Sequence, residues 1–293
     1  MPRLLVLGNA GWDLPLRLPA LPREGETLLG ERMAESPGGK GLNQAVVAAR
    51  AGADVVFVAP IGQDREGEAL RAALALEPLS FVALPSAYRT DISVLCVAPD
   101  GRNLILSTNA CADGLTVQEA EVAASRLHAG DMLLMQCGLG QQATCAAARL
   151  AVARGARVVL NAAPLRWDIL PVLPMVEVLI LNEVEAQAAA GSTHAAATRL
   201  RDAGARRVIV TLGGEGLLFV DADGPHRQPA PAAVARDTTG AGDVFCGTFA
   251  AALLACHAHP EAAAQRAAAW SVEHDGCFAA FPPAALLAAV LAA

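Results

Sequence analysis

Two glycine-rich turns, one near each end of the chain, carry side chains that could do chemistry. Residues 237–243 read DTTGAGD, and an apolar stretch typical of a helix follows them. Gly240, Ala241 and Gly242 leave backbone N–H groups bare at the start of this helix, where the helix dipole favours anions. Asp243 stands beside them and can accept a proton from a hydroxyl group. The segment predicts a site for a transferring phosphoryl group, with Asp243 as the base.

The second turn spans residues 37–44, which read PGGKGLNQ and lead into another predicted helix. Its glycines let the backbone come close to a ligand, while Lys40 and Asn43 offer hydrogen-bond donors to oxygen atoms. The turn matches neither the Walker A loop nor the dinucleotide-binding fingerprint. A polyhydroxylated ligand suits these groups. Taken alone, each of the two turns could also be no more than the start of a capped helix.

The elements that must position these turns alternate between strands and helices. The predicted strands are residues 4–7, 55–59, 132–136, 157–161, 178–181 and 207–211. Alanine-rich or apolar helical stretches include residues 42–51, 143–154 and 244–256. This alternation is typical of βαβ units, so we expect an α/β protein with a central, mostly parallel sheet flanked by helices.

Residues 13–37 and 88–108 interrupt this alternation. The first stretch contains several prolines, and the second reads as a β-hairpin around a turn at residues 99–102. If the two pair, they form a small β-sheet lid with a ligand cleft between lid and body. Ordinary surface hairpins are the alternative. An open edge of the lid could pair with a second copy, which would give a homodimer.

Composition excludes several classes of function. The formal net charge of -7 and the absence of Lys- or Arg-rich runs argue against nucleic acid and anionic membranes as partners. The apolar stretches are too short to span a bilayer, and the opening residues lack the features of a signal peptide. The seven cysteines are scattered without a C-x-x-C pair, which indicates free thiols and a cytoplasmic location.

Residues 38–44 (GGKGLNQ) and 237–243 (DTTGAGD) resemble the two signatures of the ribokinase-like (PfkB) family of sugar kinases. Further matching segments follow in the family's order: residues 161–164 (NAAP), 182–185 (NEVE) and 211–216 (TLGGEG). The resemblance covers nearly the whole chain and implies one ribokinase-like kinase domain, residues 1–293, with the lid described above. It also implies ATP-dependent phosphorylation of a hydroxyl, expected to be primary, of a small sugar.

The resemblance assigns roles to residues at matching positions. Asp243 would be the base, with an anion hole formed by Gly240, Ala241 and Gly242. The sugar would be held by Asp13, Gly39, Lys40 and Asn43. Asn182 and Glu185 would organise Mg²⁺ and the phosphates through water. The nucleotide site would also include Thr211, Gly213 and Gly216. A monovalent cation, K⁺, would be bound by Asp237, Thr239 and Gly276.

Two positions depart from the pattern of the family's ribose-specific members. Residues 11–13 read GWD where those enzymes have an asparagine before the aspartate, and Gly138 stands where they have a glutamate. Two polar sugar contacts are thereby lost, while Trp12 offers a flat face for stacking on a sugar or a nucleobase. Ribose or a related pentose is the predicted acceptor. A nucleoside kinase of the same family and a non-catalytic sugar- or nucleotide-sensing protein are the alternatives.

Overall fold

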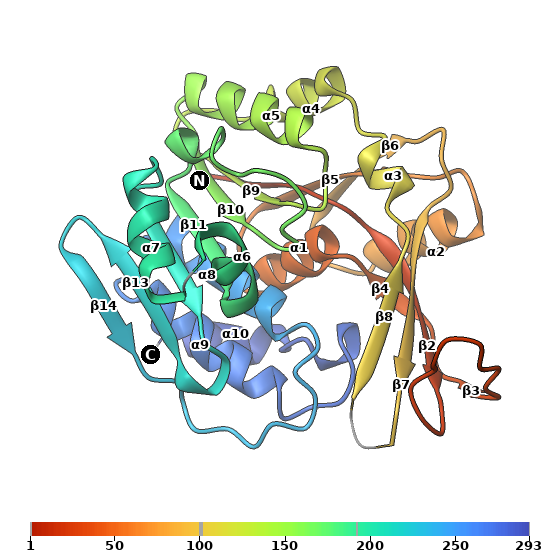
Figure 1. The fold of residues 1–293 in the computed structure, drawn as a ribbon. Helices are drawn as coiled ribbons and strands as arrows, with labels where there is room; N and C mark the ends of the chain where they lie inside the picture. Colours follow the sequence, from red (N-terminus) through yellow and green to blue (C-terminus); the bar gives the residue numbers. More distant parts are fainter. Residues whose placement is uncertain (1, 100–101, 192, 293) are drawn as a thin grey trace.

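The computed structural model describes residues 2–99, 102–191 and 193–292. Within these residues the chain forms a nine-stranded sheet with helices on both faces and a separate five-stranded sheet (Figure 1). This arrangement confirms the predicted α/β fold with a small β-sheet lid. None of the helices in the described ranges has the length and apolar character needed to cross a membrane.

The body sheet is parallel except at one end. Its strand order is β14-β13-β12-β11-β10-β9-β1-β5-β6, and only β13 and β14 run antiparallel to their neighbours within the described residues. The strands are β1 (Leu4–Leu7), β5 (Val55–Ile61), β6 (Ser80–Pro85), β9 (Met132–Gln136), β10 (Arg157–Asn161), β11 (Val178–Asn182), β12 (Arg207–Thr211), β13 (Leu217–Asp221) and β14 (Gly224–Gln228). All six predicted strands are present. The sequence prediction omitted β6 and the antiparallel pair β13–β14.

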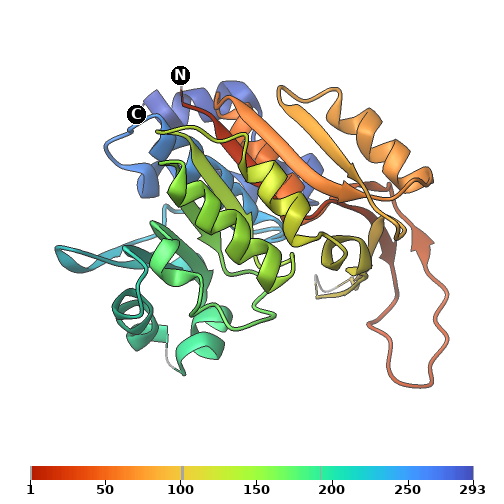
Figure 2. The same cartoon turned by 90° about the horizontal axis from the view of Figure 1, so that it is seen from above.

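Helices cover both faces of the body sheet, which explains why its central strands are continuous runs of Val, Leu and Ile. One buried cluster contains residues of α4 (Val117–Ala124), α5 (Gln141–Ala153), α6 (Glu183–Ala190) and α7 (Thr193–Asp202). The other contains residues of α1 (Lys40–Arg50), α2 (Arg65–Leu74), α8 (Ala241–Leu254), α9 (Pro260–Ser271) and α10 (Ala284–Ala292). Figure 2 shows the sheet between these two layers.

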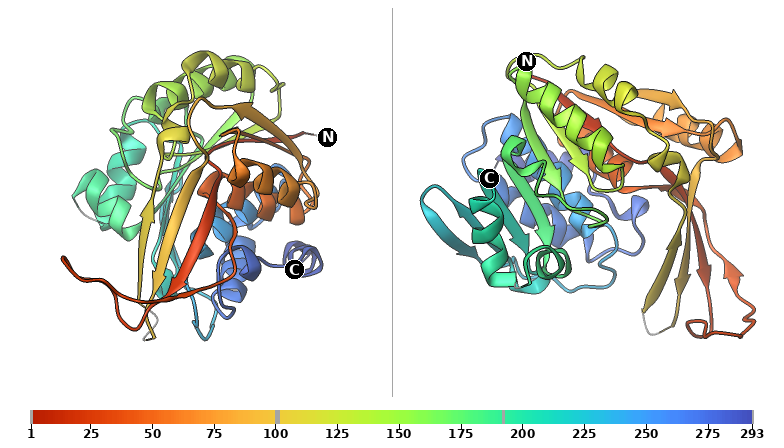
Figure 3. Two further views of the ribbon diagram at one scale, coloured as in Figure 1. Left: turned by 90° about the vertical axis from the view of Figure 1, so that its right-hand side faces the viewer. Right: turned by 45° about the horizontal axis from the view of Figure 1, so that its top comes forward.

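The lid stands away from the body at one end of the body sheet (Figure 3). Its strands are β2 (Gly11–Arg17), β3 (Glu31–Arg32), β4 (Ser36–Gly38), β7 (Asp91–Val97) and β8 (Asn103–Ser107). Strands β2 and β7 pair in parallel, which confirms that the two interrupting segments join in one sheet. Strands β7 and β8 pair antiparallel as a hairpin. The turn predicted between them includes residues 100 and 101, which lie outside the described residues.

Helices α1 and α8 pack closely because α8 carries a glycine at their contact. A Cβ atom at Gly247 would lie 2.6 Å from the carbonyl oxygen of Gln44 and 2.8 Å from Cβ of Val47. Asp243 precedes Gly247 by one helical turn and therefore faces the same neighbour. The close packing of the two helices brings Asp243 to the N-terminal turns of α1.

The Gly247→Ala substitution tests this helix contact. The added methyl group must push against the backbone of α1, so we expect the free energy of unfolding to fall by about 1–3 kcal/mol. Urea denaturation measures this change. Gly140→Ala is the matched control, because nothing lies within 4 Å of a Cβ atom at that position. Equal stabilities of the two variants would contradict the packing argument.

Candidate active site

Asp243 lies in the first turn of α8, which begins at Ala241 rather than at residue 244 as the sequence suggested. Gly240 is the N-cap residue, with a φ of 80° in the left-handed region that favours glycine. A Cβ atom at Gly240 would also lie 2.7 Å from Sγ of Cys277. The tight turn therefore requires glycine, and it sets the buried carboxylate of Asp243 at the start of the helix.

The predicted anion hole consists of the backbone around this helix start. Gly240 makes no side-chain cap hydrogen bond. The N–H groups of Ala241 and Asp243 donate to the carbonyl oxygens of Thr238 and Gly240, so among the described residues the N–H of Gly242 is the donor in the first turn of α8 that is left to a ligand. Ala241 and Gly242 line a pocket, and nothing lies within 4 Å of a Cβ atom built at Gly242. The free N–H of Gly242 and the helix dipole favour an anion at this position.

Three side chains from the first turns of α1 surround the carboxylate of Asp243. Nδ2 of Asn43 donates to Oδ2 at 2.9 Å, and Nε2 of Gln44 donates to Oδ1 at 2.9 Å. Nζ of Lys40 lies 3.8 Å from Oδ1. The charge of Asp243 raises the pKa of Lys40, with a smaller contribution in the same direction from Glu185. A cation at a helix N-terminus opposes the helix dipole, and Asp243 offsets this cost.

The lid contributes Asp13, a buried residue of β2. Burial raises the pKa of Asp13 to about 7; a hydrogen bond with Ser93 of β7 opposes the shift, and the charge of Asp243 adds to it. The carboxylate of Asp13 lies against Gly38, where a Cβ atom would be 2.3 Å from Oδ1. A group with this pKa changes charge near neutral pH.

The other predicted sugar-binding residues adjoin Asp13. Gly39 caps α1 with a φ of 95°, and Lys40 is the first residue of that helix. Asn43 is buried, and among the described residues its Oδ1 has no hydrogen-bond partner. An unpaired buried carbonyl oxygen is unfavourable unless a ligand supplies a donor. The structure thus brings the predicted sugar residues together beside Asp243.

Trp12 does not take the position that the sequence analysis gave it. Neighbouring residues of a strand point to opposite faces, so Trp12 points away from the face that carries Asp13. Its Nε1 donates to Oε2 of Glu35 at 2.8 Å, and the same oxygen lies 3.7 Å from Nη2 of Arg65 at the start of α2. Trp12 therefore lies on the face of β2 opposite Asp13 and is linked through Glu35 to Arg65 on the α2 side.

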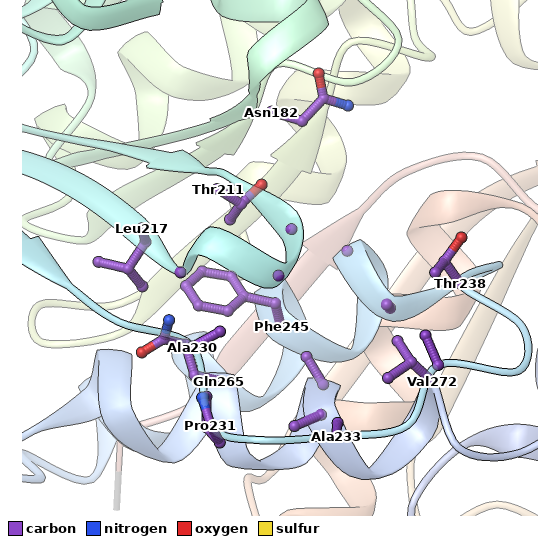
Figure 4. A pocket seen from close by; sticks show the side chains of 18 of the residues that line it. Asn182, Thr211, Leu217, Ala230, Pro231, Ala233, Thr238, Phe245, Gln265 and Val272 are labelled. Atoms are coloured by element: carbon purple, nitrogen blue, oxygen red, sulfur yellow. The ribbon is translucent and has the colours of Figure 1, made fainter.

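Of the five nucleotide residues predicted from the sequence, Glu185 does not line the pocket at this site, whereas the other four line one pocket of about 610 Å³ (Figure 4). They are Asn182, Thr211, Gly213 and Gly216, and the same pocket reaches Ala241 and Gly242 of the anion hole. The sequence analysis missed the wall formed by residues 230–233, Ala235, Phe245 and Gln265. The alanines of that wall carry no chemical signal, because a methyl side chain offers apolar surface and no donor or acceptor.

Asn182 and Glu185 form a capping box at the start of α6. The backbone N–H of each donates to the side chain of the other at 2.9 Å. Burial raises the pKa of Glu185, and the Asn182 backbone and the charge of Lys40 partly oppose this shift. The pair is therefore held rigidly at the pocket that contains Asn182, and the Glu185 carboxylate acts electrostatically on Lys40.

The three residues suggested for a monovalent cation also come together. Oδ1 of Asp237 accepts from the backbone N–H of Thr239 at 2.9 Å, and Oδ2 accepts from that of Gly276 at 3.0 Å. These bonds tie the anion-hole turn to the loop before residues 278–280. Each oxygen retains a further lone pair, so the junction offers hard oxygen donors of the kind that bind alkali cations. No group of three or more His, Cys, Asp and Glu side chains within the described residues could hold a metal ion.

The fold and the site define an α/β protein in which the pocket at Asn182 and the polar residues around Asp13 and Asn43 meet at one buried carboxylate, that of Asp243. Comparison with known proteins identifies the class further. The model of the "pfkB family carbohydrate kinase" matches residues 1–284. The chain belongs to the pfkB family of carbohydrate kinases, and it is a sugar kinase.

Individual relatives agree with this assignment. The ribokinase of Haemophilus influenzae is 34% identical over 291 residues, which is 95% of each chain. The ribokinase of Lactococcus lactis is 30% identical over 252 residues, covering 85% of this chain and 83% of the relative. Among solved structures, Thermotoga maritima ribokinase superposes with a TM-score of 0.90 at 26% identity, covering 100% of both chains. Arabidopsis thaliana ribokinase, solved with ribose and ATP, gives a TM-score of 0.83 at 25% identity, covering 99% of this chain and 98% of that one.

The pKa of Asp13 predicts a pH dependence of stability. Because this pKa of about 7 lies above the ordinary 3.8, the carboxyl group favours folding at low pH, and this contribution is lost as the pH rises toward 7. Relative to Asp13→Asn, the wild-type free energy of unfolding should fall between these pH values by at most about 1.4 kcal/mol per pH unit. Urea titrations across this range measure the difference, with Asp223→Asn as an exposed control. Parallel curves for the wild type and Asp13→Asn would contradict the assignment.

Proposed function

We propose that the protein is an ATP-dependent kinase that phosphorylates a primary hydroxyl group of ribose or a related pentose. The observation that carries the proposal is the position of Asp243. It lies in the helix turn that lines the nucleotide pocket, and it contacts the α1 residues beside Asp13. The ribokinase relatives, one of them solved with ribose and ATP, favour ribose as the acceptor.

The reaction proceeds by in-line transfer. The acceptor hydroxyl gives its proton to Asp243 as its oxygen bonds to the γ-phosphorus, and the bond from that phosphorus to the β,γ-bridging oxygen breaks. The products are a sugar phosphate and ADP. The turn at Gly240, Ala241 and Gly242 stabilises negative charge on the transferred group through the N–H of Gly242 and the helix dipole.

Lys40 is assigned to charge stabilisation as well as to sugar binding. Its ammonium group lies 3.8 Å from Oδ1 of Asp243, and its pKa is raised by both Asp243 and Glu185. A cation between the base and the residues near the phosphates offsets the charge that spreads over the phosphoryl oxygens.

The cations belong to the same proposal. Asn182 and Glu185 would hold Mg²⁺ through water, and the ion would neutralise phosphate charge. The oxygen-rich junction of Asp237, Thr239 and Gly276 fits K⁺, which would steady the anion-hole turn. Turnover that persists after chelation of Mg²⁺ would contradict the role of Mg²⁺. Turnover that does not change when K⁺ is added or removed would contradict the role of K⁺.

Two further proposals concern the setting of the enzyme. All seven cysteines are free thiols, which favours the reducing cytoplasm as its location.

The lid strand β8 is exposed along its length and carries the apolar residues Leu104, Ile105 and Leu106. Such a strand favours a homodimer through the lid. Light scattering should give twice the chain mass, and Ile105→Lys should shift the mass toward that of one chain.

The Asp243→Asn substitution tests the catalytic assignment. An amide cannot accept the proton, so turnover with ribose should fall by about 10²–10⁴-fold, while an ATP analogue should bind almost as before. ADP release and calorimetry measure the two quantities, and Asp223→Asn is the matched surface control. Undiminished turnover would contradict the role of Asp243.

The identity of the acceptor requires a panel of ribose, deoxyribose, fructose 6-phosphate and nucleosides in the same assay. We expect the highest kcat/KM with ribose. Trp12 and the two missing polar sugar contacts gave the sequence-based reasons for a nucleoside, and the position of Trp12 beside Glu35, on the face of β2 opposite Asp13, weighs against the first of them. A nucleoside preference would overturn the choice of acceptor, and absence of stimulation by every compound would favour a non-catalytic binding protein.

A further inference from the structure

A chain of buried amide side chains lies beneath the base. Nε2 of Gln136, from β9, donates to Oε1 of Gln44 at 2.8 Å. Nε2 of Gln44 in turn donates to Oδ1 of Asp243 at 2.9 Å and to Oδ1 of Asn161 at 3.1 Å. Gln44 and Gln136 are each 0% exposed, and Asn161 is 6% exposed. This row of hydrogen-bonded side chains joins β9, α1, β10 and α8 at one point.

The carboxylate of Asp243 dictates the direction of every bond in this chain. An ionised carboxylate only accepts, so Gln44 must present its NH₂ group to Asp243. The second hydrogen of that group goes to Asn161, whose own Nδ2 donates to the carbonyl oxygen of Ile180 at 3.1 Å. Oε1 of Gln44 is then the acceptor that faces Gln136. Each polar atom of the Gln44 side chain therefore has a defined partner and a single orientation.

Gln136, at the end of the amide row away from Asp243, shows that the carboxylate imposes the direction of these hydrogen bonds. Gln136 must give its NH₂ group to Gln44, which leaves its Oε1 on the side of Gly8, where a Cβ atom would lie 2.2 Å away. Among the described residues this oxygen has no hydrogen-bond partner. A buried carbonyl without a donor costs about 1–3 kcal/mol, and the opposite amide orientation would break the bond to Gln44. The unpaired oxygen of Gln136 therefore accompanies the arrangement in which the NH₂ group of Gln44 faces Asp243.

Consecutive residues of α1 hold the two oxygens of the base separately. Asn43 binds Oδ2 and Gln44 binds Oδ1, at 2.9 Å each. Successive helix residues point about 100° apart, so the two amides approach the carboxylate from different directions and prevent its rotation. Asn43 faces the acceptor side, whereas Gln44 is fully enclosed and contacts neither proposed substrate.

We propose that Gln44 is a positioning residue for phosphoryl transfer: backed by Gln136 and Asn161, it fixes the carboxylate of Asp243 in the orientation that receives the acceptor proton. The inference rests on the proposed function of Asp243 as the base. Transfer requires the reacting atoms to be placed within a fraction of an ångström, and misplacement of about 1 Å can lower the rate about 10²-fold.

The test compares Gln44→Leu and Gln44→Glu with the wild type, using whichever acceptor gives the highest turnover. Gln44→Leu should lower kcat by about 10–100-fold at every pH and leave the KM values for sugar and ATP nearly unchanged. Gln44→Glu keeps the shape, and its carboxyl group can donate to Asp243 when the two share one proton. Its activity relative to the wild type should therefore recover as the pH falls from 8 to 6.

The charges that act on the same carboxylate are common to all variants. Asp243 interacts electrostatically with Lys40 of α1, Asp13 of β2 and Glu185 of α6, and also with the thiols of Cys246 and Cys277. Thr144→Val is the control for loss of a buried polar group, because Thr144 is 0% exposed and its hydroxyl donates, within the described part of the chain, to the carbonyl oxygen of Gly140 alone. It should lower stability without changing kcat or its pH profile. A wild-type kcat in Gln44→Leu, or a Gln44→Glu loss that does not vary with pH, would overturn the positioning role.

Failure of the proposed function would appear in a different measurement. If the wild type turns over no acceptor, the contact is tested by thermal unfolding. A glutamate at position 44 beside Asp243 has a raised pKa in the folded state, so its stabilising contribution is lost as the pH rises. The melting temperature of Gln44→Glu should fall further below that of the wild type at pH 8 than at pH 6. A difference that does not depend on pH would overturn the inferred contact.

Discussion

Burying a carboxylate without leaving it unpaired is the constraint on which this structure depends. Asp243 is 4% exposed, and an ion in that position is stable only with donors and a nearby positive charge. Asn43, Gln44 and Lys40 supply them from the first turns of one helix. The close contact of α1 with α8 at Gly247 is what allows a single helix to provide all three.

The same constraint links the body to the lid. Asp13 enters the site from β2, and its pKa is raised by burial and by the charge of Asp243. Two neighbouring carboxyl groups favour a ligand that brings hydroxyl donors, as a sugar does. Trp12, next to Asp13 in the chain, points to the opposite face and is linked through Glu35 to Arg65 on the α2 side. One strand thus places a predicted binding residue and this link on opposite faces.

The nucleotide side is organised by small residues. Pocket walls of glycine and alanine leave a volume of about 610 Å³ that ends at the anion-hole turn. Much of the site was predictable, because glycine turns before helices and the capping pair Asn182 and Glu185 are local patterns with local physical causes. The pocket wall from residues 230–233 and Ala235 was not predictable, since an alanine in a loop has no distinguishing chemistry.

The sequence by itself predicted the α/β class, the six strands and the two segments that build the lid, and it singled out the turn at Asp243 as a candidate site of phosphoryl transfer. These features follow from hydrophobic periodicity and glycine-rich turns, which act over a few residues. Only the tertiary structure decided that Gln44 faces Asp243, 199 residues away, and that Gln136, 92 residues from Gln44, stands behind it. An amide side chain has no preferred partner in the sequence. Its role is set by the acceptor that the packed helices and strands bring against it.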